Sequence, residues 1–233
     1  MNKSTITSIS VAVDLQRDFF EQIGGYTGNL GVAGANDAFA KKCNELLRSD
    51  NRGDSLLVAT QDFHPEGHVS FASTHGQDLF TLFELADGRK QMMWPDHCVQ
   101  GTPGADLAPE VFDGVDVYRV FPKGTEMNVD SYGGILSDLD PDGNRIETGL
   151  GDFLRSLLLN TNEELECNIQ VIEVLGLALD YCVGTTALQI QSVVKSLGLN
   201  IPVIVFSEFC RSVASESADS MAQQFQENGI ILI

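Results

Sequence analysis

Short apolar runs with a strand-like composition alternate along the chain with stretches whose apolar residues recur at helical spacing. The clearest helical stripe is formed by Leu150, Phe153, Leu154, Leu157 and Leu158, at positions i, i+3, i+4, i+7 and i+8. The pattern predicts strands over residues 6–13, 55–60, 115–120, 169–175, 201–206 and 230–233. It predicts helices over residues 39–47, 150–158, 183–197 and 214–225.

This alternation is typical of α/β proteins, in which helices cover both faces of a parallel sheet. We therefore expect a Rossmann-like, three-layer αβα arrangement with a central, mostly parallel six-stranded sheet. The 233 residues fit a single domain, because one core can grow to about 250–300 residues. No G-x-G-x-x-G follows the first predicted strand, which argues against a dinucleotide-binding domain.

The chain is strongly acidic, with 14 Lys and Arg against 33 Asp and Glu and a formal net charge of −19. This charge argues against nucleic acid and anionic membranes as partners. No run approaches the roughly 18 apolar residues of a membrane-spanning helix, and the first residues do not resemble a signal peptide. The five cysteines are widely spaced and odd in number, as is typical of free thiols in a reducing compartment. We therefore expect a cytoplasmic protein.

A long segment at about residues 61–114 has few periodic runs and separates the second and third predicted strands. It contains all four histidines and the single tryptophan. Loops of this length inside a compact domain are uncommon unless they serve a function. We expect this segment to be an active-site and metal-binding loop.

Potentially reactive side chains follow four of the predicted strands. Asp14 ends the first strand, Asp62 and His64 follow the second, Lys123 follows the third and Cys182 follows the fourth. Ligands bind outside the carboxyl ends of the strands in an open parallel sheet. The sequence therefore predicts that these groups meet at one edge of the sheet.

The three groups outside the long segment suit a nucleophilic reaction. Cys182 lies where a strand turns into a helix, and a helix N-terminus favours a thiolate and a developing oxyanion. Asp14 directly follows a buried strand, where loss of solvent can raise its pKa toward that of a general base. Lys123 lies between Pro122 and Gly124, which restrict the local backbone, so its ammonium could stabilise a thiolate or a carboxylate. Each of these residues also has a structural interpretation that, for the residue taken alone, is as good as the catalytic one: Cys182 as an inert buried thiol, Asp14 as a turn-forming residue and Lys123 as a solvated surface lysine.

A second set of groups suits a metal ion. Asp62 and His64 lie two residues apart, on one face of an extended segment, and His97 comes from the far end of the long loop. One carboxylate and two imidazoles suit a divalent ion with open positions, zinc first and iron or manganese as alternatives. His68 is either a further ligand or a residue that holds a metal-bound water, and His75 is interpreted as a surface histidine.

Five motifs follow one another between residues 11 and 198: VDLQRDF, TQDFHPEGHVSFAS, WPDHCVQGTPGADL, FPKGT with DSYGG, and GLALDYCVGTTALQ. In this order they resemble the nicotinamidases, a branch of the isochorismatase-like cysteine hydrolases. The opening aspartate and the cysteine turn are typical of the wider superfamily. The D-x-H and W-P-x-H-C motifs are typical of the metal-dependent nicotinamidase branch.

The resemblance implies the isochorismatase-like hydrolase fold and a triad of Cys182, Asp14 and Lys123. It implies that the Cys182 thiolate attacks a carboxamide, that Asp14 carries the proton, and that a thioester forms and is hydrolysed. It also implies an oxyanion hole formed by the backbone N–H groups of Ala178 and Cys182, with a cis peptide bond between Leu177 and Ala178.

The implied reaction converts nicotinamide to nicotinate and ammonia, and pyrazinamide-like carboxamides are further expected substrates. A single divalent metal, held by Asp62, His64 and His97, would bind the pyridine nitrogen. The ring would be enclosed by Phe19, Trp94 and Tyr181, which match pocket positions of the family. The expected partners are thus a small molecule and, as an open question, further copies of the chain in a homo-oligomer.

The chain departs from the family pattern at Arg17, where Asn is usual, at Leu179, where Thr is frequent, and in a longer insert over residues 75–91. Asp18, next to Arg17, is expected to be structural, and the insert to act as a lid or an oligomer contact. Two alternatives remain. One is another hydrolase of the superfamily, such as an isochorismatase or a carbamoyl-cleaving amidase, and the other is a catalytically idle member that binds a metal or a ligand.

Overall fold

A six-stranded sheet forms the centre of the molecule in the computed structural model, which describes residues 5–50 and 54–233. Every adjacent pair of its strands is parallel. The strands lie in the order β10 (Ile231–Leu232), β9 (Val203–Arg211), β8 (Cys167–Leu177), β1 (Ile6–Val13), β4 (Ser55–Asp62) and β7 (Arg119–Lys123). The predicted parallel, six-stranded sheet is confirmed.

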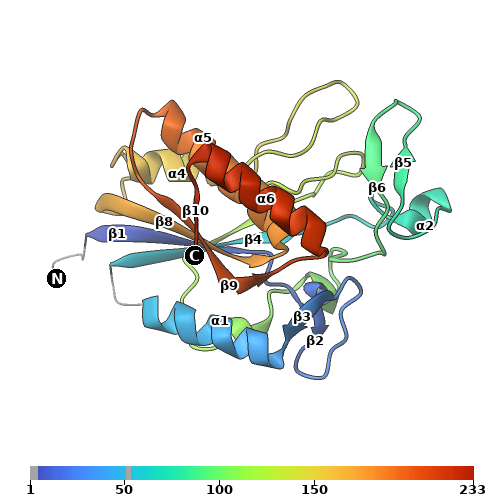
Figure 1. The fold of residues 1–233 in the computed structure, drawn as a ribbon, viewed down its shortest axis with the longest axis horizontal. Helices are drawn as coiled ribbons and strands as arrows, with labels where there is room; N and C mark the ends of the chain where they lie inside the picture. The colour runs from blue at the N-terminus through green and yellow to red at the C-terminus, as the bar shows by residue number, and fades with distance from the viewer. Residues whose placement is uncertain (1–4, 51–53) are drawn as a thin grey trace.

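Helices cover both faces of this sheet, which confirms the three-layer αβα arrangement (Figure 1). One face carries α1 (Asp37–Asp50) with the short α3 (Pro109–Phe112). The other face carries α4 (Leu150–Leu158), α5 (Gly184–Ser196) and α6 (Ser215–Asn228). Two apolar clusters fill the spaces between the layers, one on each face of the sheet.

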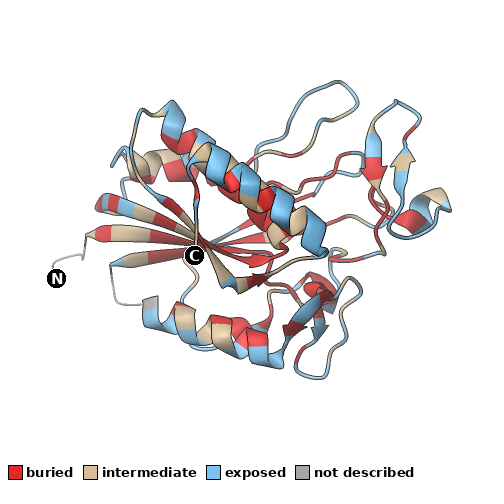
Figure 2. Ribbon diagram, viewed as in Figure 1, coloured by how far each residue is buried: buried red, intermediate tan, exposed pale blue. Residues whose placement is uncertain are grey.

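Burial along the helices follows the sequence pattern. In α4, Leu150, Phe153, Leu154 and Leu157 are buried against the sheet, whereas Leu158 is only partly buried. The strands at the middle of the sheet are buried along most of their length, and the helices expose their outer faces (Figure 2). Burial of apolar area at about 25 cal/mol per Å² is the main stabilising contribution of these layers.

Two strands, β7 and β9, differ most from their predicted bounds. Strand β7 spans Arg119–Lys123 instead of residues 115–120, because Val115 and Val117 pack against the α1-side cluster before the chain joins the sheet. The strand continues through Pro122, which is tolerated because β7 is an edge strand. Strand β9 continues to Arg211, past an irregular register with β8, so the polar residues after position 206 also belong to the sheet.

The segment between β4 and β7 is not structureless. It forms α2 (Ala72–His75), an antiparallel hairpin of β5 (Leu82–Glu84) and β6 (Lys90–Met92), a 3-10 turn η2 (Pro103–Ala105) and α3. A second small sheet, β2 (Phe20–Gln22) and β3 (Val32–Asn36), follows the 3-10 turn η1 (Arg17–Phe19). The hairpin and α2 lie beyond the carboxyl ends of the central strands (Figure 1).

Two further predictions concern cysteines and membranes. All five cysteines, Cys43, Cys98, Cys167, Cys182 and Cys210, are free and buried, as expected for thiols outside a disulfide framework. Across residues 5–50 and 54–233, no helix has the length and apolar content needed to cross a lipid bilayer.

Candidate active site

The four groups that follow the predicted strands meet at the carboxyl edge of the sheet. Asp62 ends β4 and is paired in register with Lys123, the last residue of β7. Asp14 follows β1, and Cys182 follows the neighbouring β8. The side-chain amide of Gln16 bonds to both the backbone N–H and the C=O of Asp62, which fixes the end of β1 against the end of β4.

Lys123 is the central cation of this group. Its ammonium lies 3.0 Å from Asp14 Oδ2 and 2.5 Å from Asp62 Oδ1, and it donates to the Ser131 carbonyl at 2.7 Å. The Cys182 Sγ is 3.5 Å away. Burial alone would lower the pKa of Lys123, but the carboxylates of Asp14 and Asp62 raise it well above its usual value. The ammonium is therefore charged in spite of its complete burial.

Asp14 has one carboxylate oxygen without a hydrogen-bond donor. Its Oδ1 accepts the Thr60 hydroxyl at 2.6 Å, whereas Oδ2 has only the ion pair with Lys123. A carboxylate oxygen of Asp14 lies within 4.8 Å of Cys182 Sγ. Burial raises the pKa of Asp14 against the opposing pull of Lys123. A carboxylate with a raised pKa beside a thiol is suited to accept its proton.

Cys182 lies in a π-helical turn, η3 (Leu179–Val183), which leads directly into α5. The peptide bond between Leu177 and Ala178 before this turn is cis, as the resemblance implies. Burial raises the pKa of the Cys182 thiol well above its usual value, although Lys123 opposes this shift. The thiol therefore keeps its proton until a base accepts it.

The turn that carries Cys182 is attached to the start of α6 by Asp180. The Asp180 carboxylate accepts hydrogen bonds from the backbone N–H groups of Val213 and Ala214 at 2.9 and 3.0 Å, and from the Ser217 hydroxyl. The N-cap of α6, Ala214, has no side chain that could satisfy these donors. Asp180 therefore caps the N-terminus of α6 although it is distant from this helix in sequence. The helix dipole also favours a negative charge at this N-terminus.

We expect Asp180→Asn to lower the free energy of unfolding by about 1–3 kcal/mol, because a buried, charge-assisted network loses an acceptor. Urea denaturation followed by circular dichroism measures this change. Asp219→Asn is the matched control, because Asp219 is exposed on the same helix and its replacement should cost less than about 0.5 kcal/mol. Equal effects of the two changes would contradict the capping role of Asp180.

Asp62, His64 and His97 each direct one possible ligand atom to a common point, with these atoms within 4.8 Å of one another. His64 Nδ1 is 2.8 Å from the Gly124 carbonyl and His97 Nδ1 is 2.8 Å from the Pro95 carbonyl. Because a carbonyl only accepts, each Nδ1 carries a proton, and Nε2 is the nitrogen left for a metal. Burial lowers the pKa of His64, but the Asp62 carboxylate, 3.7 Å from its Nε2, raises it above its usual value in the metal-free protein. Fixing the far nitrogen in this way is typical of metal-ligating histidines, so this donor set fits a divalent ion.

His68 differs from the other two histidines. Its Nε2 donates to the Val129 carbonyl at 3.1 Å, and its Nδ1 is 2.8 Å from the Ser70 hydroxyl, so both ring nitrogens have partners. Its ring stacks on His64 with centroids 4.1 Å apart. These contacts suit a residue that supports His64 better than a ligand. His75 lies elsewhere, partly buried instead of fully exposed, and its Nε2 contacts the Val69 carbonyl at 2.9 Å.

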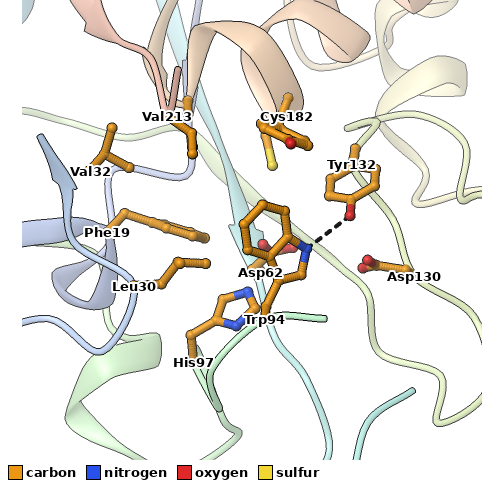
Figure 3. Close-up of a pocket in the computed structure, with 12 residues that line it drawn as sticks. Phe19, Leu30, Val32, Asp62, Trp94, His97, Asp130, Tyr132, Cys182 and Val213 are labelled. Atoms are coloured by element: carbon orange, nitrogen blue, oxygen red, sulfur yellow. Dashed lines mark hydrogen bonds between the residues drawn. The ribbon is translucent and has the colours of Figure 1, made fainter. Parts of the chain in front are cut away.

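A pocket of about 410 Å³, including open space at its mouth, leads to Cys182 (Figure 3). The predicted pocket residues Phe19, Trp94 and Tyr181 line it, as do Ala178 and Cys182. The Trp94 and Tyr181 rings meet edge to face, with centroids 5.2 Å apart. The Cys182 sulfur points into the pocket, toward Trp94 and Asp62 (Figure 3).

Five lining residues were not singled out from the sequence: Leu30, Val32, Asp130, Tyr132 and Val213. Tyr132 accepts a hydrogen bond from Trp94 Nε1 at 2.9 Å, which fixes the indole ring in the pocket wall. Val213 could have been identified, because it follows the carboxyl end of β9. Asp130 and Tyr132 lie in the DSYGG motif, whose side-chain directions have no periodic signal.

The departures from the family pattern lie around this site. Asp18 is structural, as expected: its carboxylate accepts the Tyr26 hydroxyl at 2.8 Å and the Cys98 backbone N–H at 2.7 Å. The insert over residues 75–91 contributes most of the β5–β6 hairpin, and Phe80, which precedes β5, packs edge to face on Trp94 with centroids 5.9 Å apart. The insert therefore supports a wall of the pocket.

The fold is shared with a solved hydrolase of the isochorismatase-like kind. A solved isochorismatase-like hydrolase from Alkaliphilus metalliredigens matches with a TM-score of 0.58 at 19% identity, and the match covers 97% of this chain and 94% of that one. No family model matches the sequence.

Closer similarities are to proteins named for one activity. The nicotinamidase of Escherichia coli (strain K12) is 36% identical over 216 residues, which are 92% of this chain and 87% of that protein. The solved nicotinamidase/pyrazinamidase of Acinetobacter baumanii has a TM-score of 0.75 at 30% identity, covering 99% of this chain and 97% of that one. The chain therefore belongs to the nicotinamidase family, whose members hydrolyse an amide C–N bond.

Two further solved structures are similar over nearly the whole chain and were determined with a bound ligand. The PnC1 protein of L. infantum, in complex with nicotinate, has a TM-score of 0.71 at 27% identity, covering 99% of this chain and 95% of that one. The pyrazinamidase of Pyrococcus horikoshii, in complex with zinc, has a TM-score of 0.66 at 28% identity, covering 97% and 98%.

Proposed function

We propose that this protein hydrolyses nicotinamide to nicotinate and ammonia, with Cys182 as the nucleophile and a divalent metal held by Asp62, His64 and His97. The observation that carries the proposal is the junction at Lys123. One buried ammonium contacts a carboxylate beside the thiol and a carboxylate of the metal-ligand set, and both Cys182 and Asp62 line the same aromatic pocket. The nicotinate-bound relative from L. infantum supports the substrate class.

In the acylation step, Asp14 takes the thiol proton and the Cys182 sulfur attacks the carboxamide carbon. Lys123 stabilises the thiolate and the neighbouring carboxylate during this transfer. The oxyanion accepts hydrogen bonds from the backbone N–H groups of Ala178 and Cys182. Asp14 then returns its proton to the amide nitrogen, the C–N bond breaks, and ammonia leaves behind a thioester on Cys182.

In the second step, Asp14 takes a proton from a water molecule, whose oxygen attacks the thioester carbon. The C–S bond breaks, the sulfur regains a proton, and nicotinate is released. The pocket residues Phe19, Trp94 and Tyr181 hold the aromatic ring during both steps. The bound metal supplies a Lewis acid that binds the ring nitrogen and so orients the carboxamide toward Cys182.

The metal-ligand set fits zinc, with iron and manganese as alternatives, and the zinc complex of the P. horikoshii relative supports this order. Its three neutral or anionic donors leave coordination positions for a ring nitrogen and water. Burial lowers the pKa of His97 to about 4, so its imidazole is neutral and available at physiological pH. The cytoplasmic location and the homo-oligomer remain predictions.

Removal of the metal is expected to reduce ammonia release from nicotinamide on the order of 100-fold or more, and added zinc to restore it, because the ring loses its anchoring ligand. A coupled ammonia assay on chelator-treated and zinc-reloaded protein measures this change, with metal content determined on the same samples. Pyrazinamide, which has a ring nitrogen at the corresponding position, should behave like nicotinamide.

Benzamide, which lacks the ring nitrogen, is the control substrate and should be cleaved slowly with or without zinc. His97→Ala should reproduce the chelated state, whereas His75→Ala, a change in the same long segment but outside the ligand set, should leave the rate unchanged. Rapid hydrolysis of nicotinamide without any metal would favour another reaction type of the isochorismatase-like hydrolases.

A further inference from the structure

Asp130 is a buried carboxylate in the pocket wall, and the mechanism above does not use it. The residue is 4% exposed. Its Oδ2 accepts a hydrogen bond from Gln91 Nε2 at 2.7 Å, and its Oδ1 accepts the backbone N–H of Ser131 at 2.8 Å. The carboxylate points into the pocket beside Tyr132 (Figure 3). Each oxygen keeps a further lone pair, because an ionised carboxylate can accept about four hydrogen bonds.

Asp130 lies next to the histidines of the metal-ligand set. Possible ligand atoms of His64, His68 and Asp130 lie within 4.8 Å of one another. Both ring nitrogens of His68 are already bonded to other groups, so this imidazole does not satisfy the free lone pairs of Asp130. Asp130 therefore keeps acceptor capacity close to His64 and in the wall of the pocket.

The site is rich in buried carboxyl groups. Asp14, Asp62 and Asp130 are all buried, and within the described part of the chain Lys123 is the one ammonium that contacts this group. A divalent cation bound beside His64 would lie close to the Asp130 carboxyl group, which would attract it.

We propose that Asp130 is a positioning residue of the metal centre: its carboxylate lies beside a bound divalent cation and accepts hydrogen bonds from the water around it. The proposal rests on the metal site of the proposed function and extends it to a residue outside the ligand set. The proposal also assigns a role to the insert. Gln91, at the end of the insert, comes from β6 and donates to Asp130, so the insert supports Asp130 through Gln91 and Trp94 through Phe80.

The test is the affinity of the protein for zinc, measured by competition with a chromogenic chelator, together with the melting temperature with and without zinc. Asp130→Asn is expected to weaken zinc binding about 10–100-fold, as for other groups that surround metal ligands. The rise in melting temperature on zinc binding should shrink accordingly. A merely structural residue would lower both melting temperatures and leave this rise unchanged.

Matched variants separate Asp130 from its surroundings. Asp142→Asn removes a charge from the same part of the chain, at an exposed position outside the ligand clusters, and should leave zinc affinity unchanged. Gln91→Met keeps the length of the side chain, removes the donor to Asp130 and should weaken zinc binding by a smaller factor. Should Asp130→Asn fail to fold, the affinity of Gln91→Met decides the question.

Unchanged zinc affinity in the Asp130→Asn variant, or equal losses in Asp130→Asn and Asp142→Asn, would overturn the inference. Failure of the proposed function looks different. If His97→Ala binds zinc as tightly as the wild type, or if the wild type binds no zinc, the proposed metal site is wrong. The proposed role of Asp130 is then wrong as well.

Discussion

Replacement of Cys182 by alanine is expected to reduce ammonia release from nicotinamide on the order of 10⁶-fold, because no other group can form the thioester. The Cys182 sulfur lies 3.5 Å from the Lys123 ammonium and within 4.8 Å of an Asp14 oxygen, and it opens into the pocket. Nucleophile and base act as a unit, so loss of the sulfur alone should remove nearly all of their joint contribution.

The variant should otherwise resemble the wild type. Asp62, His64 and His97 are untouched, so zinc content and nicotinamide binding should persist, and circular dichroism should be unchanged. Cys167→Ala is the matched control, because Cys167 is another buried thiol at the opposite end of the same strand, β8. Ammonia release that survives in Cys182→Ala, or that disappears equally in Cys167→Ala, would contradict the nucleophile assignment.

Lys123→Met is expected to lower the free energy of unfolding of the metal-free protein by about 3–5 kcal/mol and to abolish activity. The change leaves the carboxylates of Asp14 and Asp62 buried without their shared counterion, and breaking a buried ion pair from one side has a cost of this size. Urea denaturation and the ammonia assay measure the two effects on the same preparation.

Two further variants test the physical reason. Lys195→Met, on the exposed side of α5, should change stability by less than about 0.5 kcal/mol. The double variant Lys123→Met with Asp14→Asn should be more stable than Lys123→Met alone, because one uncompensated charge is gone, yet it should remain inactive. A double variant that is less stable than Lys123→Met would show that the broken ion pair with Asp14 does not cause the loss of stability.

Much of the fold follows from periodicity in the sequence. The α4 stripe has one buried face because apolar residues recur at the helical period, and the strand ends deliver Asp14, Asp62, Lys123 and Cys182 to one edge because all six strands are parallel. The predicted start of β7 at residue 115 was wrong. Val115 and Val117 are apolar because they pack against the α1-side cluster, and not because they belong to the sheet.

The pocket walls were harder to predict than its reactive groups. Leu30, Asp130 and Tyr132 lie in irregular segments, where tertiary contacts and not a repeating period determine the direction of each side chain. The position of His68 in the sequence likewise left two roles open. Spacing alone does not reveal that both of its ring nitrogens already have partners in Ser70 and Val129.

The order of the strands has a consequence for synthesis of the chain. β1 is made first but lies between β8 and β4, and the Asp14 that follows it meets Cys182 only after most of the chain has been made. Pairing over such long stretches of chain is slow, and an unpaired apolar strand edge is prone to aggregation. A nascent protein that has not yet released β8 from the ribosome therefore has an open edge on β1 and an incomplete active site, so enzymatic competence and protection of that edge should arise in the same folding event.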